Sequence, residues 1–173
     1  MRFNVLVGEM MKTDIKSVTP DDSVEKAAKI MRDDNIGSVV VKIDSNVKGI
    51  VTTSDIVYKH VAENKGNAVK DIMTTDVISV SPRMNVEDAA RLMVHKNVEK
   101  LLVFDKGKLV GIITNNDILS IEPALFEILL ERIKMGGMPA GDTTEYGQCE
   151  ACGNYDDSVG EVEGEYVCEE CKG

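Results

Sequence analysis

The stretch Gly49-Ile50-Val51-Thr52-Thr53-Ser54-Asp55-Ile56 decides the fold, because it returns 62 positions later as Gly111-Ile112-Ile113-Thr114-Asn115-Asn116-Asp117-Ile118. The repeat extends outward from this stretch. Residues 11–57 align with 73–119 without a gap, and 18 of these 47 positions are identical. The first two thirds of the chain therefore hold two interlocked copies of one unit with one geometry, and residues after about 120 lie outside the repeat.

Each copy is predicted to form a strand, a helix, two strands and a final helix. Apolar residues at helical spacing indicate the first helix near residues 24–31 and again near 86–93. Asp22 and Asn85 stand where these helices should be capped. Two apolar runs joined by a tight turn follow in each copy, and their lack of polar alternation indicates strands covered on both faces. The fold class is α+β, with repeats of α/β type.

The pattern Thr-x-x-Asp that begins each final helix has two explanations. It is a capping pattern, in which Thr52 or Thr114 accepts a backbone N–H and Asp55 or Asp117 supports the helix start. The same helix start also favours a bound phosphate. The glycine three residues before each threonine marks a close approach of backbone. The residues alone leave the choice between a plain cap and a ligand site open.

A family resemblance follows from these motifs taken together. Gly-x-x-Thr-x-x-Asp after two strands, an upstream Met-x-Thr-Asp segment and a Val-x-x-Ala-Ala-x-x-Met helix occur in both copies. Each copy resembles the CBS domain, and the tandem resembles a CBS pair, or Bateman module, over about residues 7–120. The resemblance implies two small sheets with flanking helices related by a pseudo-two-fold axis, a homodimer, and a regulatory module that binds an adenosine-containing small molecule.

The resemblance also assigns ligand-binding roles to particular positions. Asp55 and Asp117 match the acid that accepts hydrogen bonds from ribose hydroxyls, and two carboxylate oxygens suit a vicinal diol. The positions that match the phosphate contacts, the edge of the base pocket and its apolar walls are Thr52, Thr114, Lys100, Thr13, Thr75, Ile15 and Val77.

Lys100 makes the two expected clefts unequal. It matches a position where the family often places a base near phosphate, whereas the equivalent residue of the first copy is Ser38. A lone lysine is also commonly a solvated surface group with its stem packed on apolar neighbours. Without the resemblance, this second explanation is the simpler one.

The charge of the chain is concentrated at its C-terminal end. The net charge is −10, and residues 145–173 carry nine acidic residues and one lysine. Nucleic-acid binding requires a basic surface that displaces counterions, so this distribution argues against DNA or RNA. An acidic end instead favours a basic protein partner through electrostatic steering.

All four cysteines lie in that acidic end. Cys149-x-x-Cys152 and Cys168-x-x-Cys171 are separated by 15 residues, which is the spacing of a tetra-cysteine metal site. The two-residue gap lets both sulfurs of a pair turn onto one ion, and Gly153 permits the tight knuckle that brings backbone N–H groups to the sulfur. About 29 residues cannot bury enough apolar surface to fold alone, so the metal would supply folding energy. The segment resembles a zinc ribbon or rubredoxin-like fold, and one or two of its tyrosines, Tyr146, Tyr155 and Tyr166, are expected to make its small core.

The identity of the ion stays open between Zn²⁺ and iron. Four thiolates bind Zn²⁺ in a closed tetrahedral shell, and the same shell accepts Fe²⁺ or Fe³⁺. Disulfides are the weaker explanation in a chain expected to be cytoplasmic. Redox CxxC chemistry would require a thioredoxin-like context, which the sequence lacks. The fusion of a CBS pair with such a ribbon resembles small archaeal CBS proteins.

These features predict five consecutive parts: a first CBS repeat at 1–66, a second at 67–121, a connecting helix at 122–135, a linker at 136–144 and the ribbon at 145–173. The connecting helix follows from apolar residues at helical spacing, and the linker from its Gly and Pro content. The longest apolar runs are too short for a membrane span, and the first residues do not form a signal peptide. We therefore expect a cytoplasmic protein.

The sequence is compatible with three function classes. The first is a non-enzymatic sensor, in which a nucleotide shifts the CBS pair between two arrangements. The second is electron transfer through iron in the four-cysteine site, modulated by the pair. An enzyme is the weakest class, because no serine or cysteine has a recognisable histidine and acid partner.

Overall fold

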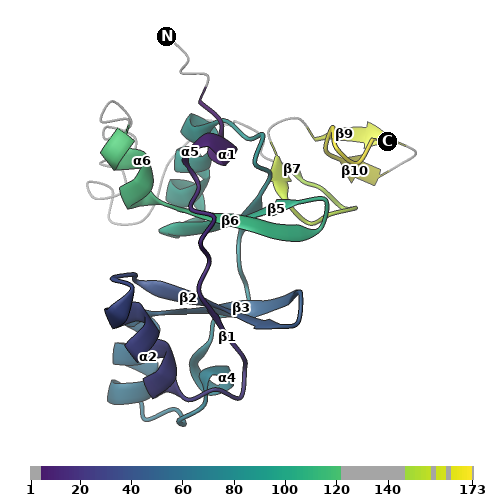
Figure 1. Ribbon diagram of the computed structural model, residues 1–173. Helices are drawn as coiled ribbons and strands as arrows, with labels where there is room; N and C mark the ends of the chain where they lie inside the picture. Colours follow the sequence, from purple (N-terminus) through teal and green to yellow (C-terminus); the bar gives the residue numbers. More distant parts are fainter. Residues whose placement is uncertain (1–4, 122–146, 157–158, 163–164, 173) are drawn as a thin grey trace. The chain divides into compact units, whose positions relative to one another are not determined.

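The computed structural model describes residues 5–121, 147–156, 159–162 and 165–172. It divides into two compact units, which are Asp14–Val77 and the combination of Met1–Thr13 with Ile78–Gly173. Each unit contains strands and helices of one repeat (Figure 1). The α+β class expected from the sequence is confirmed.

The unit Asp14–Val77 is built on a three-stranded sheet in the order β1-β2-β3. β1 runs parallel to β2, and β2 runs antiparallel to β3. Valines of the sheet pack against aliphatic residues of two helices to form the core. The elements are β1 (Ser17–Val18), α2 (Val24–Asp33), β2 (Ser38–Ile43), β3 (Asn46–Thr52), α3 (Thr53–Asp55), the π-helix η1 (Ile56–Ala62) and α4 (Val69–Ile72).

One of the two predicted helix caps is wrong. The N-cap of α2 is Ser23, whose hydroxyl accepts a backbone N–H at 3.1 Å, and not Asp22. Asp22 instead accepts the N–H of Thr19 at 2.7 Å, because its carboxylate reaches back over the turn that precedes the helix. In the second repeat the prediction holds, since Asn85 accepts the N–H of Glu87 at 2.9 Å.

The second unit contains a five-stranded sheet in the order β6-β5-β4-β8-β7, whose last two strands come from the C-terminal segment. The turn between β5 and β6 is Lys106-Gly107, with φ angles of 47° and 74°. Positive φ at both positions suits the twist of an antiparallel hairpin. The elements of the repeat are α1 (Val7–Met10), β4 (Ser79–Val80), α5 (Val86–Lys96), β5 (Lys100–Asp105), β6 (Lys108–Thr114) and α6 (Asn115–Ile121).

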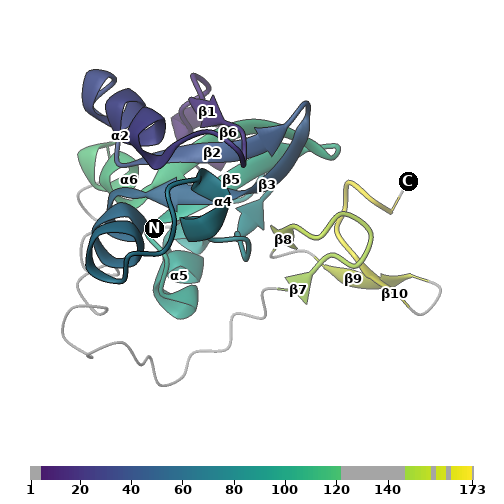
Figure 2. The ribbon, with the colours of Figure 1, turned by 90° about the horizontal axis from the view of Figure 1, so that it is seen from below.

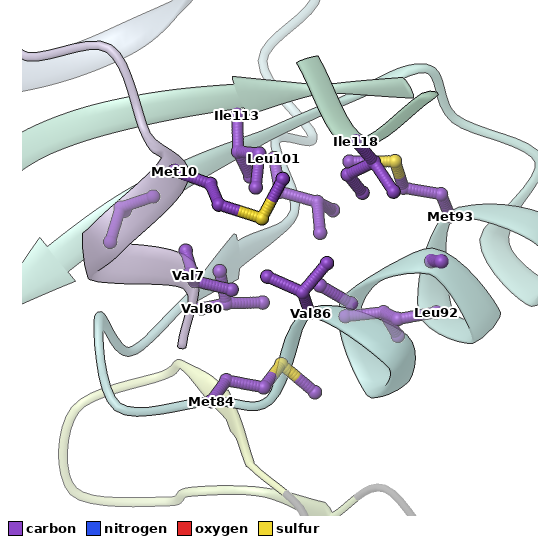
Figure 3. Close-up of a cluster of buried hydrophobic side chains, with 13 residues drawn as sticks. Val7, Met10, Val80, Met84, Val86, Leu92, Met93, Leu101, Ile113 and Ile118 are labelled. Carbon is purple, nitrogen blue, oxygen red and sulfur yellow. The ribbon is translucent and has the colours of Figure 1, made fainter. Parts of the chain in front are cut away.

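The core of this unit is aliphatic, as the low aromatic content of the chain requires (Figure 3). Side chains of α1, α5, α6 and the central strands meet between the helices and the sheet. The largest fully buried ones in this cluster are Met84, Leu92, Met93, Leu101, Ile113 and Ile118.

The short helix that precedes each repeat in the sequence packs on the other repeat. In α1, the N–H of Val7 donates to the carbonyl of Met84 at 2.9 Å. In α4, the N–H of Val69, the equivalent residue 62 positions later, donates to the carbonyl of Asp22 at 2.8 Å. Each compact unit therefore contains the short helix that precedes the other repeat in the sequence. The predicted boundaries, 1–66 and 67–121, follow the sequence repeat instead.

Two glycines permit this exchange. The backbones of Ile50 and Thr74 form an antiparallel bridge with two hydrogen bonds of 2.9 Å. A Cβ added to Gly49 would lie 2.5 Å from the carbonyl oxygen of Thr74. In the second unit Lys12 and Ile112 form the same bridge, and a Cβ on Gly111 would collide with the Met11 side chain. The close approach expected at both glycines is confirmed.

The C-terminal segment, residues 147–172, forms four short strands (Figure 2). β7 (Gly147–Gln148) pairs antiparallel with β8 (Tyr155–Asp156), and β9 (Gly160–Val162) pairs antiparallel with β10 (Glu165–Val167). β8 also runs parallel to β4, with Tyr155 opposite Val80. The small β-rich C-terminal part expected from the sequence is confirmed.

Side chains also attach the C-terminal segment to the second repeat. Glu170 pairs with Arg83 at 3.0 Å, and Lys96 lies 4.6 Å from the centre of the Tyr155 ring. Glu170 is one of the nine acids of the acidic end, so at least part of that charge is balanced within the chain.

Neither of the two described tyrosines of this segment lies in its buried cluster. Its buried cluster consists of Cys149, Val167 and Cys168, whereas Tyr155 packs against the core of the second repeat. Tyr166 is 54% exposed. The third tyrosine, Tyr146, lies outside the described residues, as do the predicted helix 122–135 and linker 136–144.

We expect Gly49→Ala to destabilise the protein more than Gly111→Ala. The new Cβ of the first variant meets a backbone oxygen that is held in the bridge, whereas that of the second meets a flexible methionine side chain. Overpacking of this kind costs about 1–3 kcal/mol. Urea denaturation of the two variants measures the difference, and an equal or reversed order would contradict the packing argument.

Candidate ligand and metal sites

The Thr-x-x-Asp motif of the first repeat forms a reciprocal cap between β3 and α3. Asp55 Oδ2 accepts the N–H of Thr52 at 2.9 Å and its hydroxyl at 2.7 Å. In return, Thr52 Oγ1 accepts the N–H of Asp55 at 3.1 Å. The capping function predicted from the sequence is therefore present, and it uses only one of the two carboxylate oxygens.

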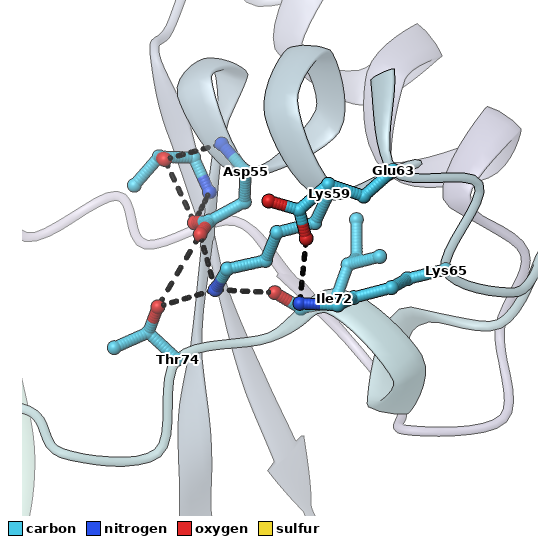
Figure 4. Close-up of polar contacts among 7 residues, drawn as sticks. Asp55, Lys59, Glu63, Lys65, Ile72 and Thr74 are labelled. Carbon is cyan, nitrogen blue, oxygen red and sulfur yellow. Dashed lines mark hydrogen bonds and ion pairs between the residues drawn. The ribbon is translucent and has the colours of Figure 1, made fainter. Parts of the chain in front are cut away.

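The other oxygen of Asp55 belongs to a second polar network (Figure 4). Lys59 Nζ lies 2.6 Å from Asp55 Oδ1, and it also donates to the carbonyl of Ile72 at 2.9 Å and to Thr74 Oγ1 at 3.1 Å. Thr74 in turn donates its hydroxyl to Asp55 Oδ1 at 3.3 Å. Lys59 lies in the π-helix η1, one turn after Asp55, which brings the two side chains together.

The second repeat has the same cap but a different partner for the outer oxygen. Asp117 Oδ2 accepts the N–H of Thr114 at 2.9 Å and its hydroxyl at 2.6 Å. Asp117 Oδ1 lies 2.8 Å from Lys12 Nζ. Lys12 is the sequence equivalent of Thr74, and the bridge to Ile112 places it beside the motif.

Both carboxyl groups are held in the ionised form. Burial raises the pKa of Asp55, but hydrogen bonds from Lys59 and Thr52 outweigh burial and lower its pKa below the ordinary value. Burial likewise raises the pKa of Asp117, and hydrogen bonds from Lys12 and Thr114 lower it below the ordinary value. Each site therefore contains a nearly buried carboxylate that is ionised.

Lys100 lies at the start of a central strand of the second unit. It is the first residue of β5 and pairs with Thr114 of β6, just as Ser38 pairs with Thr52 in the first repeat. Directly opposite residues of an antiparallel pair share one face of the sheet. The Lys100 ammonium lies 3.9 Å from the exposed Glu99 carboxylate, and its side chain is 20% exposed. The inequality between Lys100 and Ser38 is therefore present in the structure.

The four predicted residues of the base pocket lie in the extended segments just before β1 and β4. Thr13 and Thr75 are exposed, whereas Ile15 and Val77 are half-buried. Thr13 directly follows Lys12, and Thr75 directly follows Thr74. Their contact with a ligand remains a prediction.

Sequence reasoning missed three residues that contact the acids, namely Lys12, Lys59 and Thr74. Lys59 carried a signal, because a lysine four residues after an aspartate on a helix is a common ion pair. Lys12 and Thr74 carried no such signal, because the acid that each one contacts is distant in the sequence.

The four cysteine sulfurs form one cluster in the C-terminal segment. All four are free thiols, and their sulfurs lie within 4.8 Å of one another. The N–H of Cys152 points to Cys149 Sγ at 3.5 Å, and Gly153 follows with a φ of 76°. This is the tight knuckle expected from the sequence. Cys149 and Cys168 are buried, whereas Cys152 and Cys171 keep contact with solvent.

The cluster has the dimensions and chemistry of a tetrahedral metal site. With metal–sulfur bonds of about 2.3 Å, neighbouring sulfurs in a tetrahedron lie about 3.8 Å apart. The distance from Cys152 Sγ to Cys168 Sγ is 3.9 Å. These cysteines fit a metal ion as ligands, and the arrangement does not distinguish zinc from iron because both accept four thiolates.

The surroundings of the thiols shift their pKa values in opposite directions. Burial raises the pKa of Cys149, but backbone N–H groups of Cys168 and Cys152 lower it to about 6. Burial and neighbouring thiols raise the pKa of Cys171 to about 11 and also raise that of Cys152. Four thiolates so close together repel one another, and a bound cation would relieve this repulsion.

The comparison with known proteins identifies the repeats. The model of the CBS domain family, described as "CBS domain", matches residues 7–61 and again residues 69–123. The chain belongs to the CBS domain family. An uncharacterized protein from Methanopyrus kandleri is 35% identical to it, over 97% of this chain and 91% of the relative. The relative covers the C-terminal segment as well as the CBS pair.

Two solved CBS structures hold adenosine compounds. The CBS domain pair of protein MJ0100, in complex with 5′-methylthioadenosine and S-adenosyl-L-methionine, is 29% identical with a TM-score of 0.65, covering 69% of this chain and 97% of that one. CBSX2, in complex with AMP, is 27% identical with a TM-score of 0.59, covering 70% of this chain and 98% of that one.

None of the helices among the described residues is long and apolar enough to cross a bilayer.

We expect the stability that Asp55 contributes to depend on pH. Its pKa is lowered in the folded state, so the contribution is complete above the pKa of the unfolded chain and is lost as the pH falls through the folded pKa. Asp55→Asn should therefore lower the free energy of unfolding by about 1–3 kcal/mol at about pH 7 and much less at about pH 2.

Denaturation of this variant at both pH values, beside Asp44→Asn as a control, measures the effect. Asp44 is an exposed residue of the β2–β3 turn, and asparagine tolerates its φ of 53°. A loss of stability in Asp55→Asn that does not change with pH would contradict the ion-pair explanation.

We expect removal of the metal to unfold residues 147–172 while the two repeats stay folded, because the buried cluster of that segment is too small to hold it. Hydrogen exchange before and after treatment with a chelator measures this. Cys152→Ser should reproduce the loss, and Ala151→Ser, a change at the exposed neighbour, should not. Unchanged protection of the segment after complete metal removal would show that its fold does not depend on the ion.

Proposed function

We propose that the protein is a non-enzymatic regulatory protein whose CBS pair binds an adenosine-type nucleotide. The observation that carries this proposal is the carboxylate of each Thr-x-x-Asp motif. One oxygen holds the cap, and the other is directed away from the cap toward a lysine. A carboxylate with an oriented outer oxygen suits a ribose diol, and the MJ0100 and CBSX2 structures support the ligand class.

The predicted site residues take consistent roles in this proposal. Asp55 or Asp117 accepts the ribose hydroxyls, while Thr52 in the first repeat, or Thr114 and Lys100 in the second, face phosphate. The base lies against Thr13 and Ile15 or against Thr75 and Val77. Ligand binding then favours one arrangement of the CBS pair over another, which is the regulatory event.

The four-cysteine site is proposed to hold zinc as a structural ion that folds a contact surface. Its two buried ligands and its knuckle suit a structural site. The alternative is iron and electron transfer, and the solvent contact of Cys152 and Cys171 favours it by offering a short path for an electron. We further propose that the protein forms a homodimer in the cytoplasm and that its acidic C-terminal end, residues 145–173, binds a protein partner. The five parts predicted from the sequence are its proposed domains.

Calorimetry on the metal-loaded protein tests the nucleotide proposal. We expect saturable binding of at least one of AMP, ATP and S-adenosylmethionine, because all three carry the ribose diol. Guanosine monophosphate is the control for the base. If none of the three adenosine compounds binds, the nucleotide function is wrong.

Elemental analysis and a visible spectrum separate the two metal functions. One zinc per chain in a colourless protein is the expected result. A red protein that loses its colour reversibly with reductant would instead establish the iron alternative. Protein from the native source removes the bias of the metal supply in an expression host.

A further inference from the structure

The two acidic motifs differ in how completely their hydrogen-bonding capacity is used. An ionised carboxylate offers about four acceptor positions, two on each oxygen. In the first repeat Asp55 Oδ2 accepts two hydrogen bonds from Thr52, and Oδ1 receives both Lys59 and Thr74. All four positions of Asp55 are occupied by the chain itself.

The lysine of the first repeat is equally committed. An ammonium group has three hydrogens to donate. Lys59 Nζ has three acceptors, namely Asp55 Oδ1, the carbonyl of Ile72 and Thr74 Oγ1. Its side chain is 30% exposed. Displacing Lys59 would break three contacts at once and leave a buried backbone carbonyl to be satisfied.

The second repeat leaves one position open. Asp117 Oδ2 is used by Thr114, but Lys12 is the one partner of Oδ1 within the part of the chain that the structure describes. The side chain of Lys12 is 63% exposed, and Asp117 is its one ion-pair partner among the same residues. Asp117 is nearly buried, but the lysine end of the pair lies in solvent, so an incoming hydroxyl can replace Lys12 without displacing a packed side chain.

The difference has a simple origin in the repeat. Lys12 and Thr74 occupy the same position, 62 residues apart, at the bridge that places them beside the two acids. Thr74 donates a hydrogen bond to Asp55 Oδ1 and accepts one from Lys59 Nζ, so it holds Lys59 beside the acid. Lys12 instead reaches Asp117 with a largely exposed side chain, because its long stem lets the ammonium group stay in solvent.

We propose that the second repeat, through Asp117, is the site that takes the ligand, that the first is closed by its own Lys59–Thr74 network, and that the ligand is an adenosine compound carrying phosphate. This inference rests on the proposed function. The ribose hydroxyls replace Lys12 at Asp117 Oδ1 and use its open position. The displaced Lys12 ammonium and Lys100, which lies opposite Thr114, are then available to the phosphate.

A matched pair of variants tests this assignment by calorimetry with ATP on the full metal-loaded chain. We expect one ATP per chain, a loss of affinity of at least about 10-fold in Asp117→Asn, and affinity near that of the wild type in Asp55→Asn. Lys12→Met should weaken ATP by about 5-fold without weakening adenosine. Thermal unfolding of each variant verifies that it is folded.

Hydrogen exchange on the unmutated protein gives the same answer without relying on a variant that folds poorly. ATP should protect the backbone around residues 112–119 and leave residues 50–57 unchanged. Two ATP per chain, protection confined to 50–57, or a loss of affinity confined to Asp55→Asn would overturn the assignment while leaving nucleotide binding intact. No binding of AMP, ATP or adenosine by the wild type would overturn both.

Discussion

The antiparallel bridge between Ile50 and Thr74, and its copy between Ile112 and Lys12, is the constraint on which the surroundings of both acidic motifs depend. A Cβ would collide with the Thr74 carbonyl at Gly49 and with the Met11 side chain at Gly111, so a glycine precedes the bridging isoleucine in each repeat. The bridge also decides which residue faces the acid. It brings Thr74 to Asp55 and Lys12 to Asp117, although each pair is far apart in sequence.

The two explanations of the Thr-x-x-Asp motif are compatible, because a carboxylate has two oxygens. In each repeat Oδ2 closes the reciprocal cap, and Oδ1 faces a lysine. The cap fixes the orientation of the carboxylate, and the lysine offsets the cost of burying it. A capping carboxylate of this kind therefore keeps its outer oxygen oriented, and the partner of that oxygen differs between the two repeats.

The C-terminal segment depends on two separate sources of order. Among its described residues, the buried apolar cluster contains only two cysteines and one valine, so we expect a bound ion to supply stability that so small a core does not. Its position beside the second repeat rests instead on the pairing of β8 with β4 and on the Arg83–Glu170 ion pair. The first source was visible in the cysteine spacing. The second was not, because a two-residue strand leaves no periodic signal.

The sequence by itself determined the duplication, the α+β class, the CBS family, the caps at Thr52 and Thr114 and the four cysteines as one cluster. All of these depend on local spacing or on repetition, which a chain shows before it folds. It misplaced the cap of α2 by one residue, because local preference does not fix which of two neighbouring side chains accepts the N–H group, and it did not show that Tyr155 packs against the second repeat. Only the tertiary structure decided that the opening segments are exchanged and that Lys59 and Thr74 close one acid while Lys12 covers the other. Those facts come from contacts between distant residues, and the backbone bridge that creates them exists only once the chain has folded.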